Sequence, residues 1–325
     1  MNNIRQQQMY NLLSLSSNYN NKVQQRKMQQ DRIQRLQKQK IARDQEKLRI
    51  RQKQLHIKKK NINYKTSRKL GINMMVNKPK ILSKKEQHRN LCMKYLPVIR
   101  NINIPEFKDE TNVKETILIE FRVMPHLEYL VRRTILTLNN WNHTIVCGNN
   151  NYDMIHAMCE LIHKDVKTKI KIIKLDVGNM IVSQYSDMLK TKTFWDRFVG
   201  EKLLLYQEDT LLFHGNIARF LQYDYVGAPW RKINYASNSF VGNGGFSLRS
   251  KSVMLSCISL TSIHEPLPED VYFAKTITKY NVGNIAPKYI AKMFSQEQEL
   301  GDNPVGGHAY WLANNNIDEN FYKIN

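Results

Sequence analysis

Residues 115–149, ETILIEFRVMPHLEYLVRRTILTLNNWNHTIVCGN, determine the fold class of this chain. The stretch begins with a short Ile-rich run that is typical of a buried strand. Apolar residues then recur at helical spacing: Leu127, Leu130, Val131, Ile135 and Leu138. A second apolar run, HTIVCGN at 143–149, ends in a glycine turn. A strand, a helix and another strand in succession predict neighbouring parallel strands.

The same alternation continues along the chain. After it come an amphipathic helix (NYDMIHAMCELIHK, 151–164), a strand (KIKIIKLDV, 169–177), a helical stretch at 180–198 and a Leu-rich strand in KLLLYQEDT, 202–210. This order predicts a mixed, mostly parallel α/β sheet with helices on both faces. Ligand sites of such sheets lie outside the carboxyl ends of the strands, so the residues directly after each apolar run are the candidates.

The formal charge of +22 is confined to the N-terminal third of the chain. Residues 1–100 contain 26 Lys and Arg against four Asp and Glu, whereas residues 101–325 contain 24 of each. We expect a basic, helical or disordered arm at 1–60, a linker at 61–110 and a globular domain at 111–325. The arm could bind a polyanion such as nucleic acid, an anionic membrane surface or an acidic partner. The alternative is a merely solvated extension.

The four cysteines, Cys92, Cys147, Cys159 and Cys257, form no CxxC pair. Scattered thiols are typical of a reducing compartment, and we expect them to be buried as small hydrophobic side chains. The sequence has no run of 18 apolar residues, so we expect no membrane span. The N-terminus also lacks the apolar core of a secretory signal, which predicts an intracellular, non-secreted protein.

Two short motifs suggest a phosphate-binding site. Gln207-Glu208-Asp209-Thr210 follows the Leu-rich run directly, and carboxylates at a strand end suit Mg²⁺ or Mn²⁺, which in turn bind a diphosphate. An ordinary solvated turn is the alternative. VGNGGFSLRS, residues 241–250, has glycines that allow the backbone to approach a ligand closely, or that simply form a tight turn.

Two further motifs place polar groups near helix or loop ends. PEDVYFA, residues 268–274, has Glu269 and Asp270 after a proline, as at a helix start. One of these carboxylates could instead be a general base at the mouth of a pocket. NPVGGHAYW, residues 303–311, has two glycines before His308, which favours a loop that closes over a ligand, although a lone histidine is often structural.

Taken in order, these motifs resemble a glycosyltransferase-like family of unknown function from giant viruses and algae. The resemblance covers about residues 115–312. It rests on the opening stretch, LLYQEDTLL, YDYVGAPW, VGNGGFSLRSKSVM, PEDVYFA and NPVGGHAYW. It implies a GT-A-type fold, the architecture of nucleotide-diphospho-sugar transferases, with the basic arm as an addition.

The resemblance also implies roles for single residues. Asp209, Glu208 and the late His308 would hold Mn²⁺ or Mg²⁺, with Gln207 in place of the first Asp of a D-x-D motif. Asp270 would be the catalytic base and Glu269 its neighbour. The residues that would contact donor or acceptor are Glu120, Arg122, Gln207, Thr210, Trp230, Gly242, Asn243, Gly244 and Gly245.

The implied activity is transfer of a sugar from a nucleotide-diphospho-sugar to a hydroxyl of a glycan, a protein or a small molecule, with inversion; a retaining outcome is the alternative. If the chain is viral, it would act in the host cytoplasm, the virus factory or the virion. A rival from another class is a catalytically degenerate binding or structural protein, tethered to polyanions by its arm. Gln207 and the basic extension favour that rival.

Overall fold

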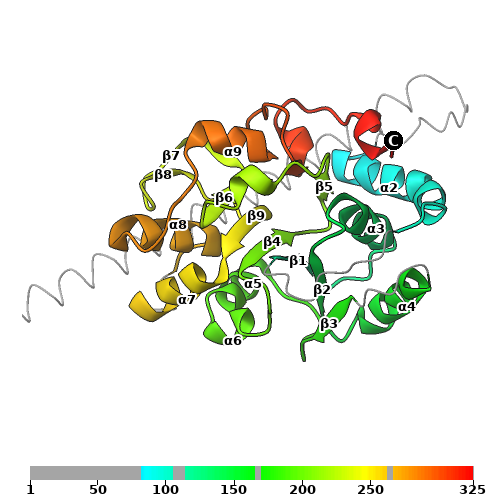
Figure 1. The fold of residues 1–325 in the computed structure, drawn as a ribbon, viewed down its shortest axis with the longest axis horizontal. Coiled ribbons are helices and arrows are strands. Elements are labelled where there is room, and N and C mark those ends of the chain that lie inside the picture. Colours follow the sequence, from blue (N-terminus) through cyan, green and yellow to red (C-terminus); the bar gives the residue numbers. More distant parts are fainter. Residues whose placement is uncertain (1–81, 105–113, 165–169, 262–265, 325) are drawn as a thin grey trace, which may run out of the picture. The chain divides into compact units, whose positions relative to one another are not determined.

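The computed structural model describes residues 82–104, 114–164, 170–261 and 266–324, all of which lie in one compact unit, Ile81–Asn325. The expected basic arm, residues 1–60, lies outside the described residues. Figure 1 shows a central sheet with helices on both of its sides. None of the helices in the described ranges is long and apolar enough to cross a bilayer, as the sequence predicts.

The central sheet has six strands in the order β3-β2-β1-β4-β9-β6. Its parallel part consists of β3 (Lys171–Lys174), β2 (Asn142–Cys147), β1 (Lys114–Ile119) and β4 (Lys202–Tyr206). The remaining pairs are antiparallel: β9 (Phe246–Ser250) with β4, and β6 (Tyr225–Gly227) with β9. The predicted mixed, mostly parallel sheet is therefore confirmed.

Helices cover both faces of the sheet, so neighbouring residues of one strand are buried on opposite sides. Leu118 of β1 belongs to the core beneath α2 (Lys84–Arg100), α3 (Leu127–Thr137) and α4 (Tyr152–His163). Ile117 and Ile119 belong to the core beneath α5 (Val182–Leu189), α6 (Lys192–Trp195), α7 (Lys251–Leu260) and α8 (Glu269–Tyr280). Strands buried on both faces are apolar throughout, which explains the unbroken run in β1. All four cysteines of the chain are buried and free, as predicted.

A small second sheet joins the end of β4 to the C-terminal part of the chain. It has the order β10-β11-β5, formed by β10 (Ser295–Gln296), β11 (Gly306–His308) and β5 (Thr210–Leu212). β5 follows β4 after a short turn, and its antiparallel register with β11 places His308 opposite Thr210. Backbone pairing thus carries the late histidine to the acidic end of β4, about 100 residues earlier in sequence.

Much of the expected linker at 61–110 is a helix of the folded unit. Ser83 begins α2 with a capping box in which Ser83 and Glu86 bond each other's backbone N–H groups. Cys92, Leu96 and Ile99 lie on one face of the helix and are buried in the core. Pro97, read from sequence as a linker residue, lies inside this helix, where it leaves the buried face intact.

Candidate active site

A pocket of about 490 Å³ opens where β1 and β4 end. Ten of the residues singled out in the sequence line it: Glu120, Arg122, Gln207, Asp209, Asn243, Gly244, Gly245, Glu269, Asp270 and His308. The carboxyl-end rule therefore located the pocket, although these residues come from five separate parts of the chain. Glu208, Thr210, Trp230 and Gly242 do not line it, and the structure gives each of them a packing or bonding role instead.

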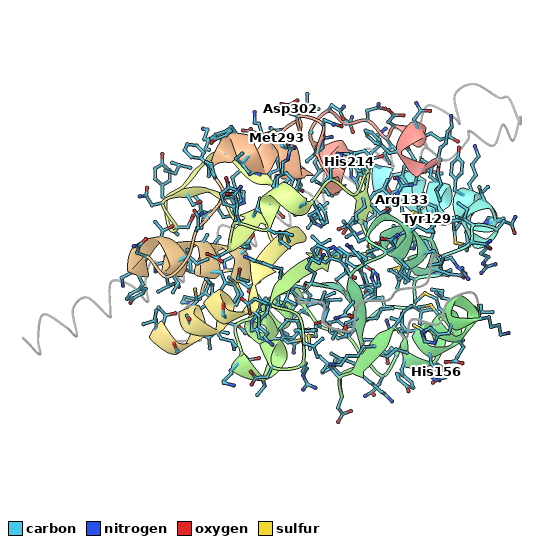
Figure 2. All side chains as sticks on the ribbon, in the orientation of Figure 1. Tyr129, Arg133, His156, His214, Met293 and Asp302 are labelled. Atoms are coloured by element: carbon cyan, nitrogen blue, oxygen red, sulfur yellow. The ribbon has the colours of Figure 1, made fainter. Side chains whose placement is uncertain are left out.

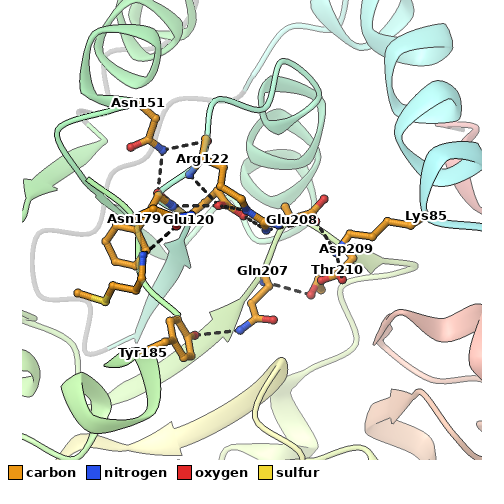
Figure 3. Close-up of polar contacts among 12 residues, drawn as sticks. Lys85, Glu120, Arg122, Asn151, Asn179, Tyr185, Gln207, Glu208, Asp209 and Thr210 are labelled. Atoms are coloured by element: carbon orange, nitrogen blue, oxygen red, sulfur yellow. Dashed lines mark hydrogen bonds and ion pairs between the residues drawn. The ribbon is translucent and has the colours of Figure 1, made fainter. Parts of the chain in front are cut away.

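A tight turn separates the side chains of the QEDT motif. The N–H of Gln207 donates to the hydroxyl of Thr210 (3.1 Å), and the N–H of Thr210 donates to the carbonyl of Gln207 (3.0 Å). The Thr210 hydroxyl also donates to the carbonyl of Gly245 (3.2 Å), which fastens the strand end to the glycine loop. Thr210 is thus a turn residue. The amide of Gln207 donates to the hydroxyl of Tyr185 (3.0 Å), as Figure 3 shows.

Asp209 points into the pocket between two cationic groups. Its Oδ2 accepts from Lys85 Nζ at 2.8 Å, and its Oδ1 lies 3.1 Å from His308 Nε2. Burial alone would raise the pKa of Asp209, but the bonds and charges of His308 and Lys85 outweigh it and hold the pKa well below its usual range. Asp209 is therefore a permanent negative charge in the wall of the pocket.

His308 lies between two carboxylates. Its Nε2 faces Asp209, and its Nδ1 lies 3.3 Å from Glu297 Oε2, an ion-pair contact without hydrogen-bond geometry. Burial alone would lower the pKa of His308, but its bond to Asp209 and the two negative charges raise it to about 10. The ring packs on Gly245, where an added Cβ would lie 2.4 Å from Nδ1. A glycine is therefore required opposite the imidazole.

A divalent cation could take Asp209 and His308 as two of its ligands only by displacing the proton that the two carboxylates hold on His308. The 3.1 Å between Oδ1 and Nε2 suits two atoms that ligate one ion at the usual bond lengths of about 2.1 Å. In the part of the chain that the structure describes, no three His, Cys, Asp or Glu side chains form a complete metal site. Mg²⁺ sites commonly take their remaining ligands from substrate phosphates and water, and a nitrogen ligand suits Mn²⁺ better.

Glu208, the second expected metal ligand, points away from the pocket. Its side chain is 1% exposed and accepts from Arg89 Nη2 at 2.9 Å, while His126 Nε2 lies 3.1 Å from its Oε2. Burial would raise the pKa of Glu208, but the bonds from its cationic neighbours outweigh it and hold the pKa well below its usual range. Glu208 therefore fastens α2 and the start of α3 to the end of β4.

The turn after β1 holds Arg122 at the rim of the pocket. Both oxygens of Glu120 accept from the guanidinium of Arg122, at 2.8 and 2.7 Å, and Glu120 Oε1 also accepts from the N–H groups of Phe121 and Arg122. Asn151 donates to the carbonyls of Glu120 and Arg122, as Figure 3 shows. This arrangement fixes a partly exposed cation beside the pocket, where anionic ligands can reach it.

The glycine loop is shaped by its neighbours. A Cβ on Gly244 would lie 2.2 Å from Glu269 Oε1, so this position needs glycine for close packing against α8. A Cβ on Gly242 would lie 2.6 Å from the ring of Trp230, in the hairpin of β7 (Pro229–Asn234) and β8 (Ser239–Val241). Gly242 and Trp230 are therefore packing partners behind the loop, whereas Asn243, Gly244 and Gly245 face the pocket.

The two carboxylates that begin α8 have different surroundings. Glu269 accepts two hydrogen bonds from the guanidinium of Arg249, at 2.7 and 3.1 Å, in a bidentate salt bridge. Arg249 is fully buried against the rings of Trp195 and Tyr225. Asp270 accepts only from the N–H of Val271 among the bonds described, at 2.8 Å. Burial, and then the charge of Glu269, raises the pKa of Asp270 to about 7. Asp270 is therefore suited to exchange a proton near neutral pH.

Glu269→Gln is expected to destabilise the fold by about 3 kcal/mol, because it leaves the buried guanidinium of Arg249 without a counter-charge. Urea unfolding followed by circular dichroism measures this loss. Asp302→Asn, at an exposed aspartate, is the control. A loss below about 0.5 kcal/mol, the range of ordinary surface substitutions, would show that the Arg249–Glu269 pair is not structural.

Three residues at the site escaped the sequence analysis: Lys85, Tyr185 and Glu297. Lys85 lies in α2, inside the segment 61–110 that the sequence predicts to be a linker. Glu297 follows the two-residue strand β10. Tyr185 lies in α5, where its hydroxyl meets Gln207. No local motif marks any of the three. The capping box at Ser83 and the apolar spacing of Cys92, Leu96 and Ile99 were the signals that could have identified α2.

Comparison with protein families places part of this pocket in a recurring segment. Residues 167–308 are similar to a family described as a protein of unknown function (DUF5672). No curated protein matches the chain. The matched segment contains the QEDT turn, the glycine loop, Asp270 and His308, whereas β1, β2, α2 and α3 lie outside it.

Proposed function

We propose that this protein is a glycosyltransferase that moves a sugar from a nucleotide-diphospho-sugar to a hydroxyl acceptor, with Mn²⁺ or Mg²⁺ as its cofactor. One observation carries the proposal: the Asp209–His308 pair and Asp270 open into the same pocket at the carboxyl ends of the parallel strands. A group able to hold a cation and its diphosphate thus shares a cavity with a group able to take a proton. The mixed, mostly parallel sheet is the fold class that the GT-A resemblance implies.

On the donor side, Asp209 and His308 would hold the cation. When bound, such an ion offsets the negative charge that builds up on a departing diphosphate. Arg122 lies at the rim with its guanidinium fixed by Glu120 and offers a further positive charge. Asn243, Gly244 and Gly245 form the pocket wall beside the Asp209–His308 pair, and the two glycines let Glu269 and His308 pack closely against the loop.

On the acceptor side, Asp270 takes the proton of the attacking hydroxyl. The acceptor oxygen forms a bond to the anomeric carbon while the bond from that carbon to the diphosphate oxygen breaks. The nucleoside diphosphate leaves with the bonding electrons, and attack opposite the leaving group inverts the carbon. Glu269 remains bonded to Arg249 and keeps the first turn of α8 in place.

Hydrolysis of a panel of nucleotide sugars, with Mn²⁺ or with EDTA, tests the donor site. We expect turnover of at least one donor, and we expect Asp209→Asn and EDTA each to lower it about 100-fold by removing the cation's contribution. Asp302→Asn, at an exposed aspartate near the edge of the molecule (Figure 2), is the control and should match the wild type. Equal turnover by the wild type and Asp209→Asn, with and without EDTA, would rule out the cation site.

A further inference from the structure

Lys85 is the pocket residue that no sequence motif and no family match assigns. It is the second residue of α2, its side chain is 38% exposed, and it lines the pocket. Its Nζ lies 2.8 Å from Asp209 Oδ2 and 2.6 Å from Glu208 Oε1. Figure 3 shows the side chain reaching from α2 to the end of β4.

The two acids that contact Lys85 already have other cationic partners. Glu208 is contacted by Arg89 and Arg122, and Asp209 faces His308. An ammonium group has three N–H donors, and the two carboxylates engage two of them. The third N–H has no partner among the bonds described, and Lys85 lines the pocket, so this donor is available to a ligand bound there.

The backbone that carries Lys85 is firmly held. The capping box of Ser83 and Glu86 fixes the first turn of α2, and Arg89 on the next turn bonds Glu208. His88 is fully buried and bonds the hydroxyl of Tyr322 at 2.7 Å. A lysine on such a helix presents its charge at a defined place, which lowers the entropic cost of binding an anion.

We propose that Lys85 binds phosphate oxygens of the donor's diphosphate, so that α2 completes a donor site whose remaining anion-facing groups are Arg122 and the cation held by Asp209 and His308. The inference rests on the proposed function for the identity of the donor. The ammonium acts as a point charge with N–H donors, the usual manner in which lysine contacts phosphate. A residue more than 80 positions before the family-matched segment thereby belongs to the binding site.

Calorimetric titration of the full chain with inorganic pyrophosphate, in EDTA and again with Mn²⁺, tests the assignment. Lys85→Met keeps the aliphatic stem and is expected to weaken pyrophosphate binding at least tenfold in both conditions. Lys94→Met removes the same charge from the same helix, at the exposed pair with Glu319, and should bind like the wild type. Because both variants keep the basic arm, any binding of pyrophosphate there is the same in each.

Lys85→Arg distinguishes a binding role of Lys85 from a purely structural one. It keeps a positive charge at this position, so it should recover most of the affinity for pyrophosphate that Lys85→Met loses. Equal affinities of the wild type and Lys85→Met would overturn the assignment, and so would a wild type that binds no pyrophosphate. Pyrophosphate binding that depends on Lys85, without turnover of any nucleotide sugar, would support the anion site and count against the transferase alone.

Discussion

Asp270→Asn is expected to lower the rate of sugar transfer about 1,000-fold at pH 7.5, because a positioned general base contributes about 10²- to 10⁴-fold. The amide has nearly the same shape and can still accept from the N–H of Val271, so the pocket should remain intact. Initial rates with the donor found in the hydrolysis panel measure the loss. Transfer at the wild-type rate would show that another group removes the acceptor proton.

The pH dependence of the wild type provides a second measurement on the same residue. Only ionised Asp270 can accept a proton, and its pKa is raised to about 7 by burial and by Glu269. Transfer should therefore rise about tenfold per pH unit below pH 7 and level off above pH 8. A flat profile between pH 5.5 and 8 would contradict the assignment of Asp270 as the base.

The same substitution should stabilise the fold at alkaline pH. The folded pKa of Asp270 lies above the unfolded value of 3.8, so the stability that its protonated form provides is fully present below about pH 4 and is lost progressively until the pH passes 7. Asn has no charge to bury, so Asp270→Asn should exceed the wild type at pH 8 by roughly 2 kcal/mol, a figure reduced from about 4 for partial solvent access. Urea unfolding at pH 5 and pH 8 measures the difference, which should be less than half as large at the lower pH.

Deleting residues 1–104 is expected to abolish folding, whereas deleting residues 1–80 should leave a cooperatively folded protein. The longer deletion removes α2 together with Ile104, and so removes three buried aliphatic side chains: Leu96, Ile99 and Ile104. Burial of each contributes about 1.5–3 kcal/mol, so the loss approaches the 5–15 kcal/mol that holds a typical domain together. Thermal unfolding followed by circular dichroism compares the two truncated chains.

Point variants of α2 separate this packing effect from the removal of charge. Leu96→Ala, at a side chain that is 5% exposed, should cost about 2–5 kcal/mol. Val98→Ala lies two residues away at 49% exposure and should change the stability by less than about 0.5 kcal/mol. A cooperative transition in the chain without residues 1–104, at the temperature of the shorter deletion, would mean that α2 is dispensable.

The regular part of the fold follows from local sequence. The apolar runs at Ile117–Ile119 and Leu203–Leu205 are buried on both faces, and such runs require a sheet covered by helices on both sides. The position of the pocket followed in turn, because parallel strands end at one edge of the sheet. The rule covers Asp209, which follows β4, whereas Asp270 begins a helix and was placed at the site by the family resemblance.

The orientation of single side chains could not be predicted in the same way. Glu208 and Asp209 are adjacent and chemically alike, and only tertiary contacts decide that Asp209 faces the pocket while Glu208 faces Arg89. Glu269 and Asp270 present the same ambiguity, which the buried guanidinium of Arg249 resolves. Helix α2 was missed because its apolar face is narrow and its surface is basic.

The pocket is lined by residues from inside and from outside the family-matched segment. The segment that matches a family of unknown function ends at His308 and supplies Asp209, Asp270, the imidazole and the glycines, while Arg122 and Lys85 come from sequence upstream of it. The family match therefore describes only part of the pocket, and two of its cationic side chains are set by the rest of the folded unit.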